Sequence, residues 1–174
     1  CSGAQVYIPD LGHDIFHERV PEDFVEDLYP LCNAERCIAT ITVEDRALVK
    51  LDGEPRPGSL SAEMQWVPQL STQASTRPRV ANIQGSGVYR RIREELQPRY
   101  QGQVNFFNSI GPSGKNIMTL TSVKASKGEA LKRACAYLEI DPSEVITFGD
   151  AENDIEMFRI SGASVAMGQA DEKT

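Results

Sequence analysis

The stretch from residue 145 to residue 158, VITFGDAENDIEMF, places acidic and amide side chains directly behind a short apolar run. Asp150 follows the apolar residues Val145–Phe148, and Asn153 and Asp154 come three and four positions later. Mg²⁺ prefers hard oxygen ligands of this kind, together with waters and a substrate phosphate. An alternative is that Asp150 and Asp154 only cap the following helix and favour its positive N-terminal end. The spacing is compatible with both interpretations.

The elements around this stretch predict an α/β arrangement from residue 123 onward. Ser126 and Glu129 have the spacing of a capping box, so we expect a helix to begin there. Val145–Phe148 is typical of a parallel strand that is covered on both faces. A second helix and the strand Ser164–Met167 follow. This order indicates a doubly wound sheet, in which ligands bind at the carboxyl ends of the strands, where Asp150 is expected.

Residues 5–122 have a different order of elements. Two strands come first, and the pattern helix-strand-strand then occurs twice, which predicts an antiparallel sheet with helices on one face. A short helix broken by Pro68 is predicted within residues 60–70. The expected strands are residues 4–8, 15–20, 37–43, 47–51, 79–84, 103–108 and 116–121, and the expected helices are residues 22–31 and 86–97.

A glycine-rich stretch, IQGSGVYRRIR, opens the second of these helices. It is similar to a phosphate-binding loop, but a single Gly-x-Gly is a weak signal. We interpret it as a turn from a strand into a helix, followed by arginines that face solvent.

Composition excludes several classes of partner. The 174 residues carry a formal net charge of −7, whereas proteins that bind nucleic acid carry surplus Lys and Arg. No apolar run approaches the roughly 20 residues of a membrane span, and no signal peptide is visible. The four cysteines are too sparse for a disulfide framework, so we expect reduced, mostly buried thiols and a cytoplasmic location.

The stretch SKGEALKRACAYLEIDPSEVITFGDAENDIEMFRISGASVAMGQA resembles the C-terminal core of haloacid dehalogenase superfamily phosphatases of the Cof type. Its Ser-Lys-Gly start matches the third motif of that family, and Gly-Asp-x-x-Asn-Asp matches the fourth. The resemblance implies that Lys127 binds phosphate and is catalytic, and that Asp150 binds Mg²⁺. It also implies that Asn153 orients the phosphate and that Asp154 supports catalysis. Lys124 is the nearest competitor for the role of Lys127.

The resemblance also implies a fold and a domain organisation. We expect an incomplete doubly wound parallel core and an α+β cap domain with an antiparallel sheet. Residues 1–4 would be the junction from core to cap, since Ser2-Gly3-Ala4 resembles that point of the family. Residues 5–122 would form the cap domain, and residues 123–174 would form the C-terminal part of the core.

The chain departs from the family pattern at the nucleophile. No Asp-x-Asp-Gly-Thr stretch occurs, and the nearest string, Asp52-Gly53, lacks the partner Asp and the Thr. The Ser or Thr of the second motif also has no counterpart. In the family both precede the cap, so we expect them upstream of Cys1, and we expect final core elements beyond Thr174. As it stands, the chain is predicted to be an inactive fragment.

The resulting functional hypothesis is a Mg²⁺-dependent phosphatase that acts through an aspartyl-phosphate. Its substrate would be a small phosphorylated metabolite, such as a sugar phosphate or a phosphorylated cofactor. Two alternatives stay open: a non-catalytic module that binds a ligand or partner, and a phosphomutase of the same superfamily. The identity of the substrate and the oligomeric state do not follow from the sequence.

Overall fold

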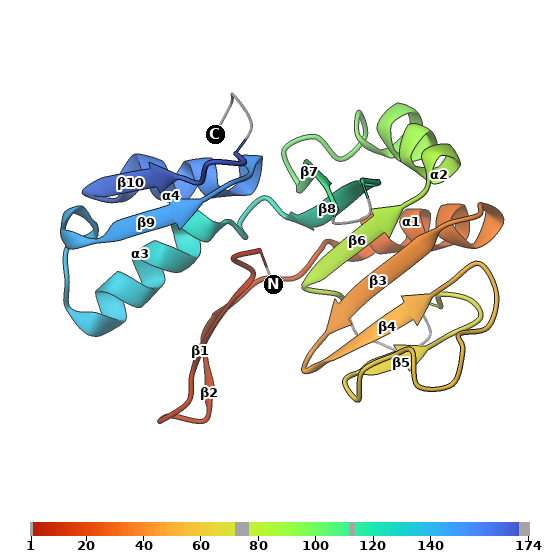
Figure 1. Cartoon of the computed structure of the whole chain (residues 1–174), viewed down its shortest axis with the longest axis horizontal. Coiled ribbons are helices and arrows are strands. Elements are labelled where there is room, and N and C mark those ends of the chain that lie inside the picture. The colour runs from red at the N-terminus through yellow and green to blue at the C-terminus, as the bar shows by residue number, and fades with distance from the viewer. Residues whose placement is uncertain (1, 72–76, 112–113, 171–174) are drawn as a thin grey trace. The chain divides into compact units, whose positions relative to one another are not determined.

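The chain forms two compact units, as seen in a computed structural model that describes residues 2–71, 77–111 and 114–170. Unit 1 combines residues 1–18 with residues 123–174, and unit 2 is the continuous stretch 19–122 (Figure 1). Unit 2 is therefore inserted between the two segments of unit 1. Residues 1, 72–76, 112–113 and 171–174 lie outside the described residues.

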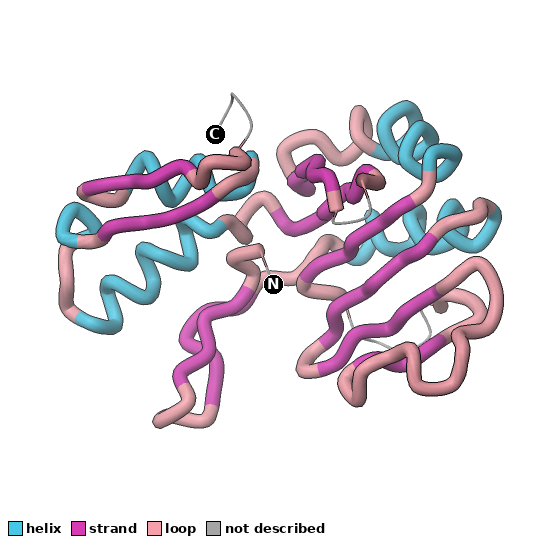
Figure 2. The backbone as a smooth tube through the Cα atoms, viewed as in Figure 1, coloured by secondary structure: helices cyan, strands magenta, loops and turns pink. Residues whose placement is uncertain are grey.

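Unit 2 is built on a six-stranded sheet with the order β5-β4-β3-β6-β8-β7 (Figure 2). Neighbouring strands are antiparallel except for β4 and β5, which are parallel. The strands are β3 (Ile38–Val43), β4 (Arg46–Lys50), β5 (Met64–Trp66), β6 (Val80–Gln84), β7 (Val104–Ile110) and β8 (Asn116–Ser122).

The prediction of a short helix within residues 60–70 is wrong, because this segment contains the edge strand β5. Its residues pair with Ala47, Leu48 and Val49 of β4. A helix interrupted by Pro68 would have little more than one turn to form hydrogen bonds, and such short helices are marginal without strong packing. The free edge of β4 offers backbone partners instead.

The core of unit 2 lies between the helices and one face of the sheet. Strand β3 buries Ala39, Ile41 and Val43 in alternation, as expected for a sheet with one face in the core. Helix α1 (Glu22–Ala34) and helix α2 (Ser86–Arg91), which continues as a π-helical turn (Ile92–Leu96), supply the other side. The predicted helical stripe is confirmed, since Val88, Ile92 and Leu96 are all buried. The largest fully buried side chains of this core are Phe24, Leu28, Ile41, Ile83, Ile92, Met118 and Leu120.

Unit 1 contains a hairpin and an α/β segment. The hairpin pairs β1 (Gln5–Ile8) with β2 (His13–His17), and the α/β segment pairs β9 (Ile146–Gly149) with β10 (Ala163–Ala166) in parallel. Helix α3 (Lys127–Leu138) packs against helix α4 (Ile155–Ile160), and short 3-10 helices occupy residues 142–144 and 152–154. The predicted order helix-strand-helix-strand is confirmed.

The predicted burial of β9 on both faces is wrong for the described residues. Thr147 and Gly149 are buried, but the side chains of Ile146 and Phe148 are each 61% exposed. The physical reason is that helices from the described part of the chain cover only one face of this two-stranded sheet. Ile146 and Phe148 therefore form an exposed apolar face of β9 in the described structure.

The division into units differs from the predicted organisation in one segment. The predicted boundary near residue 122 coincides with the end of unit 2, but residues 5–18 group with unit 1. The hairpin belongs there because β1 and β2 both contact α3, and because the backbone N–H of Glu18 donates to the carbonyl oxygen of Ala4.

Candidate active site

The position of Lys127 is fixed by the cap of helix α3. The Ser126 hydroxyl accepts a hydrogen bond from the backbone N–H of Glu129 at 3.1 Å, so the predicted N-cap forms. The second half of the capping box does not form, because the Glu129 carboxylate pairs with Arg133 at 2.9 Å instead. Lys127 is the first helical residue, and its side chain points toward the loop after β9.

Asp154 connects that lysine to the loop. Its Oδ1 lies 2.5 Å from the Nζ of Lys127. Its Oδ2 accepts hydrogen bonds from the backbone N–H groups of Asp150 at 3.0 Å and Ala151 at 3.2 Å. Asp154 is 2% exposed, and both of its carboxylate oxygens are used within the protein. Asp154 therefore holds both the loop after β9 and the lysine.

The pKa of Asp154 is lowered from its ordinary value by these contacts. Burial is the largest influence and raises the pKa, because it disfavours the charged form. The hydrogen bond from Lys127 and those from the backbone of Asp150 and Ala151 act in the opposite direction and outweigh burial. The carboxylate of Asp154 is therefore held ionised, with the ammonium of Lys127 beside it.

Asp150 presents its carboxylate at the mouth of β9. The residue is exposed, and the Nε2 of Gln169 lies 3.4 Å from its Oδ2, a long and weak contact. Asn153 differs, because its side-chain oxygen is buried and has no hydrogen-bond partner among the described residues. Asp154 and Lys127 are thus brought together, and Asp150 is joined to them through its backbone, whereas the side-chain oxygen of Asn153 takes part in no hydrogen bond within the described residues.

Two glycines, Gly149 and Gly3, allow this packing. A Cβ on Gly149 would lie 2.5 Å from the Cβ and Cγ of Asp154, and one on Gly3 would lie 2.2 Å from the carbonyl carbon of Ser126. Gly3 also has a φ of +82°, which favours glycine. The Gly-Asp pair at 149–150 was a usable signal for the contact of Gly149. The contact of Gly3 with Ser126 joins residues more than a hundred positions apart, and no local pattern reveals it.

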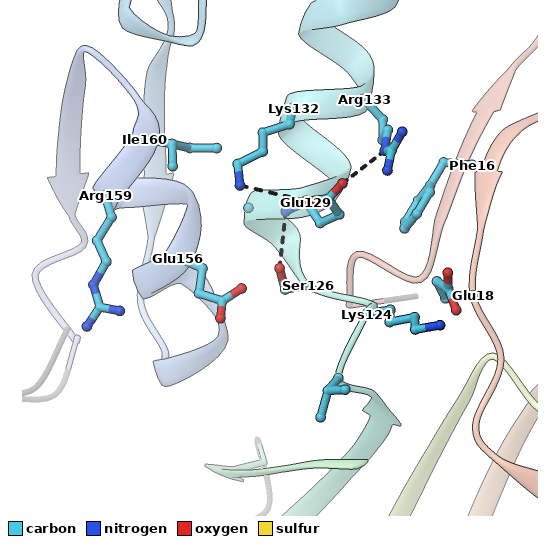
Figure 3. A pocket seen from close by; sticks show the side chains of 12 residues that line it. Phe16, Glu18, Lys124, Ser126, Glu129, Lys132, Arg133, Glu156, Arg159 and Ile160 are labelled. Carbon is cyan, nitrogen blue, oxygen red and sulfur yellow. Dashed lines mark hydrogen bonds and ion pairs between the residues drawn. The ribbon is translucent and has the colours of Figure 1, made fainter. Parts of the chain in front are cut away.

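A pocket of about 500 Å³ lies beside α3 in unit 1, but the candidate site residues do not line it. Figure 3 shows Glu129 at its centre, paired with Arg133 and, at 3.7 Å, with Lys132. Lys124 lines this pocket, whereas Lys127 contacts Asp154. Of the two lysines that the sequence offers for the phosphate-binding role, only Lys127 contacts a candidate site residue in the described structure.

Comparison with known proteins places these observations in a family. A family profile described as haloacid dehalogenase-like hydrolase matches residues 1–174, and the chain belongs to this family. The fold agrees: a solved sugar phosphatase of haloacid dehalogenase subclass IIB superposes with a TM-score of 0.77 at 17% identity. That comparison covers 99% of this chain and 64% of the other. The predicted family and fold class are thereby confirmed.

Curated relatives match over smaller parts of their length. The phosphatase YwpJ of Bacillus subtilis is 36% identical over 91 residues, which cover 52% of this chain and 31% of that protein. The chloroplastic endoribonuclease YBEY of Arabidopsis thaliana is 26% identical over 178 residues, which cover 99% of this chain and 28% of that protein. The chain thus spans about a third or less of these relatives.

No helix in the described ranges is long and apolar enough to cross a membrane.

Proposed function

We propose that the chain carries the lysine and metal half of the active site of a phosphoric monoester hydrolase. The observation that carries this proposal is the contact of Lys127 with Asp154, whose other oxygen holds the loop that presents Asp150. A phosphatase named among the relatives and a sugar phosphatase among the solved structures support the same reaction class. The substrate would be a small phosphorylated metabolite, such as a sugar phosphate or a phosphorylated cofactor.

The acidic loop fits Mg²⁺, which takes one or two carboxylates and completes its shell with waters and substrate oxygens. Asp150 is the exposed carboxylate at the strand end, and Asn153 has a buried oxygen that lacks a partner in the described chain. We assign Asp150 to the metal, with Asn153 in support. Mg²⁺ bound there would neutralise charge on the transferring phosphoryl group.

Lys127 would hold the phosphate. An ammonium carries three N–H donors, and Asp154 takes one of them. The side chain is 33% exposed, so the remaining donors can reach a substrate oxygen. Asp154 would act as a positioning residue, because its own oxygens are occupied. The ammonium would then offset negative charge as the phosphoryl group transfers, which is the main task of a protein in this chemistry.

An aspartyl-phosphate intermediate requires a nucleophilic carboxylate that none of the four site residues supplies. Asp150 is assigned to the metal, Asp154 is committed to Lys127, and no Asp-x-Asp-Gly-Thr stretch occurs in the 174 residues. We therefore propose that the 174 residues alone do not hydrolyse phosphate esters. Completion of the site by an Asp-x-Asp-Gly-Thr segment would make the reaction proceed in two easier steps.

The test compares phosphate release from an aryl phosphate, with and without Mg²⁺, by two proteins. One is the 174-residue chain, and the other is the gene product translated from its own start codon. We expect Mg²⁺-dependent release only where an Asp-x-Asp-Gly-Thr segment is present. Asp150→Asn should then lower kcat/KM by roughly two orders of magnitude or more, since a metal ligand is lost.

The matched control is Glu152→Gln, which removes an exposed carboxylate two positions further on. We expect it to retain most of the activity. Equal losses in the two variants would contradict the assignment of Asp150, and strong Mg²⁺-dependent turnover by the 174-residue chain would contradict the proposal of an incomplete site.

A further inference from the structure

A pair of thiols lies where helix α1 of unit 2 leads into strand β3. Cys32 is fully buried in the last turns of α1, and Cys37 is 3% exposed just before β3. Both cysteines are free. The Sγ of Cys37 lies 3.2 Å from the carbonyl oxygen of Cys32, to which its thiol donates.

A buried amine accompanies this pair. Lys50, at the end of β4, is 6% exposed, although a lysine is almost never fully buried without partners. Its Nζ donates to the Cys37 sulfur at 3.7 Å and to the carbonyl oxygen of Glu35 at 3.3 Å. An ammonium held against a sulfur atom favours the thiolate form of that sulfur.

The two thiols are therefore unequal. The hydrogen bond from Cys32 is the largest influence on Cys37, and with the charge of Lys50 it lowers the pKa of Cys37 to about 7, against burial and the Glu35 carboxylate. The hydrogen bond to Cys37 and burial raise the pKa of Cys32 well above its ordinary value. One sulfur is suited to attack an electrophile, and the other stays protonated beside it.

Cys37 is one of the residues that line a pocket of about 210 Å³ in unit 2, which has room for several molecules the size of water. The charged residues that line this pocket are Arg36, Asp52 and Lys115, and Arg36 is paired with Asp52 at 2.9 Å. Gly85 keeps the contact with Cys37 close, because a Cβ there would lie 3.1 Å from the Cβ of Cys37.

We propose that Cys37 and Cys32 form a peroxide-sensitive thiol pair, in which Cys37 reacts first and Cys32 resolves the product. The Cys37 thiolate attacks hydrogen peroxide, breaks the O–O bond and becomes a sulfenic acid, while hydroxide leaves. The Cys32 sulfur then attacks the Cys37 sulfur, and a disulfide forms as the sulfenic oxygen leaves as water. Peroxide gains the two electrons that the two thiols lose.

The test uses the full chain in a Cys1→Ser background, treated with hydrogen peroxide and digested with trypsin. Trypsin cleaves after Arg36, so the disulfide joins two peptides that are otherwise separate. We expect this cross-linked pair to form and to disappear with dithiothreitol. Cys135, which is buried on α3 of unit 1, is the matched control in the same molecule and should stay reduced.

Three variants identify the roles. In Cys32→Ser the reaction should stop at the sulfenic acid of Cys37, which dimedone traps. Lys50→Met should slow oxidation of Cys37 at neutral pH by about tenfold, and Lys50→Arg should restore most of the rate, because the positive charge is what favours the thiolate. Circular dichroism confirms that each variant is folded. Oxidation of Cys135 as fast as Cys37, or a folded chain without the cross-link, would overturn the proposal.

Discussion

Asp154 is the residue on which the candidate site depends, because it is the contact shared by the lysine and the loop. Its Oδ1 is taken by Lys127 and its Oδ2 by two backbone N–H groups. Asp150, four positions earlier, is exposed and keeps its carboxylate available. The two acids of one motif thus lie in different environments, Asp154 inside the protein and Asp150 at its surface.

Replacing Asp154 by Asn should lower the free energy of unfolding at pH 7 by about 1–3 kcal/mol. An Asn side chain has only one acceptor oxygen, so it cannot serve both Lys127 and the backbone of the loop. Lys127 is partly exposed and can return to water, which keeps the loss moderate. Urea titration monitored by circular dichroism measures it, and Asp150→Asn, which removes an exposed acid, is the control with little expected change.

The difference in unfolding free energy between the wild type and Asp154→Asn should depend on pH. Because folding lowers the pKa of Asp154, its stabilising contribution is fully present above the pKa of the unfolded chain, about 3.9. It is lost as the pH falls through the folded pKa. The difference in stability between the wild type and Asp154→Asn should therefore shrink below about pH 4. A difference that stays constant from pH 7 to pH 3 would contradict this ionic role.

At the scale of elements, the site depends on where α3 begins and where β9 ends. Ser126 caps the helix just before Lys127, and Gly149 ends the strand just before Asp150. The two residues that meet, Lys127 and Asp154, are 27 positions apart. Close backbone approaches hold these ends together, including the contact of Gly128 with the backbone of Glu156, where a Cβ would lie 2.9 Å away.

Gly149→Ala tests the approach of the strand end to Asp154. The added Cβ would lie 2.5 Å from side-chain atoms of Asp154, so the buried carboxylate must move from its partners. We expect a loss of about 1–3 kcal/mol in unfolding free energy, as for other overpacked positions. Gly168→Ala is the control, because a Cβ there meets nothing within 4 Å. A thermal melt of both variants suffices, and equal melting temperatures would contradict the packing argument.

Sequence patterns predicted these elements well where the signal is local. The cap at Ser126, the strand before Gly149 and the stripe of Val88, Ile92 and Leu96 all depend on residues a few positions apart. Patterns failed where partners are remote: β5 exists because β4 has a free edge, and Gly3 packs on a helix that begins at residue 127. The spacing of the motif also could not decide which of its two acids is buried.

At the scale of the whole molecule, the two units differ in how they are assembled. The main apolar core is made entirely of residues of unit 2, whose numbers run from Val20 to Leu120. Unit 1 is made from two segments that meet where β1 and β2 contact α3. Unit 2 has its own sheet, helices and core, as an independent domain does.

We expect the excised segment 19–122 to fold on its own. Its six strands and two helices make their pairings and its core without residues of unit 1. A urea titration followed by tryptophan fluorescence, with Trp66 as the probe, and by circular dichroism should give one cooperative transition with coincident midpoints. Two separated transitions, or a gradual loss of signal, would show that unit 2 depends on residues outside it.

The insertion of unit 2 also affects the order in which the parts of the protein can fold during translation. The ribosome releases the hairpin of residues 5–17 early, but its partner α3 begins only at Lys127. More than a hundred residues must be translated in between, which takes roughly 5–20 seconds at about 5–20 residues per second. Unit 2 can fold before α3 and the strands after it are complete, since all of its residues precede α3. During synthesis the early hairpin therefore has no partner helix until late, and the candidate site is completed last, because Lys127, Asp150 and Asp154 all follow unit 2.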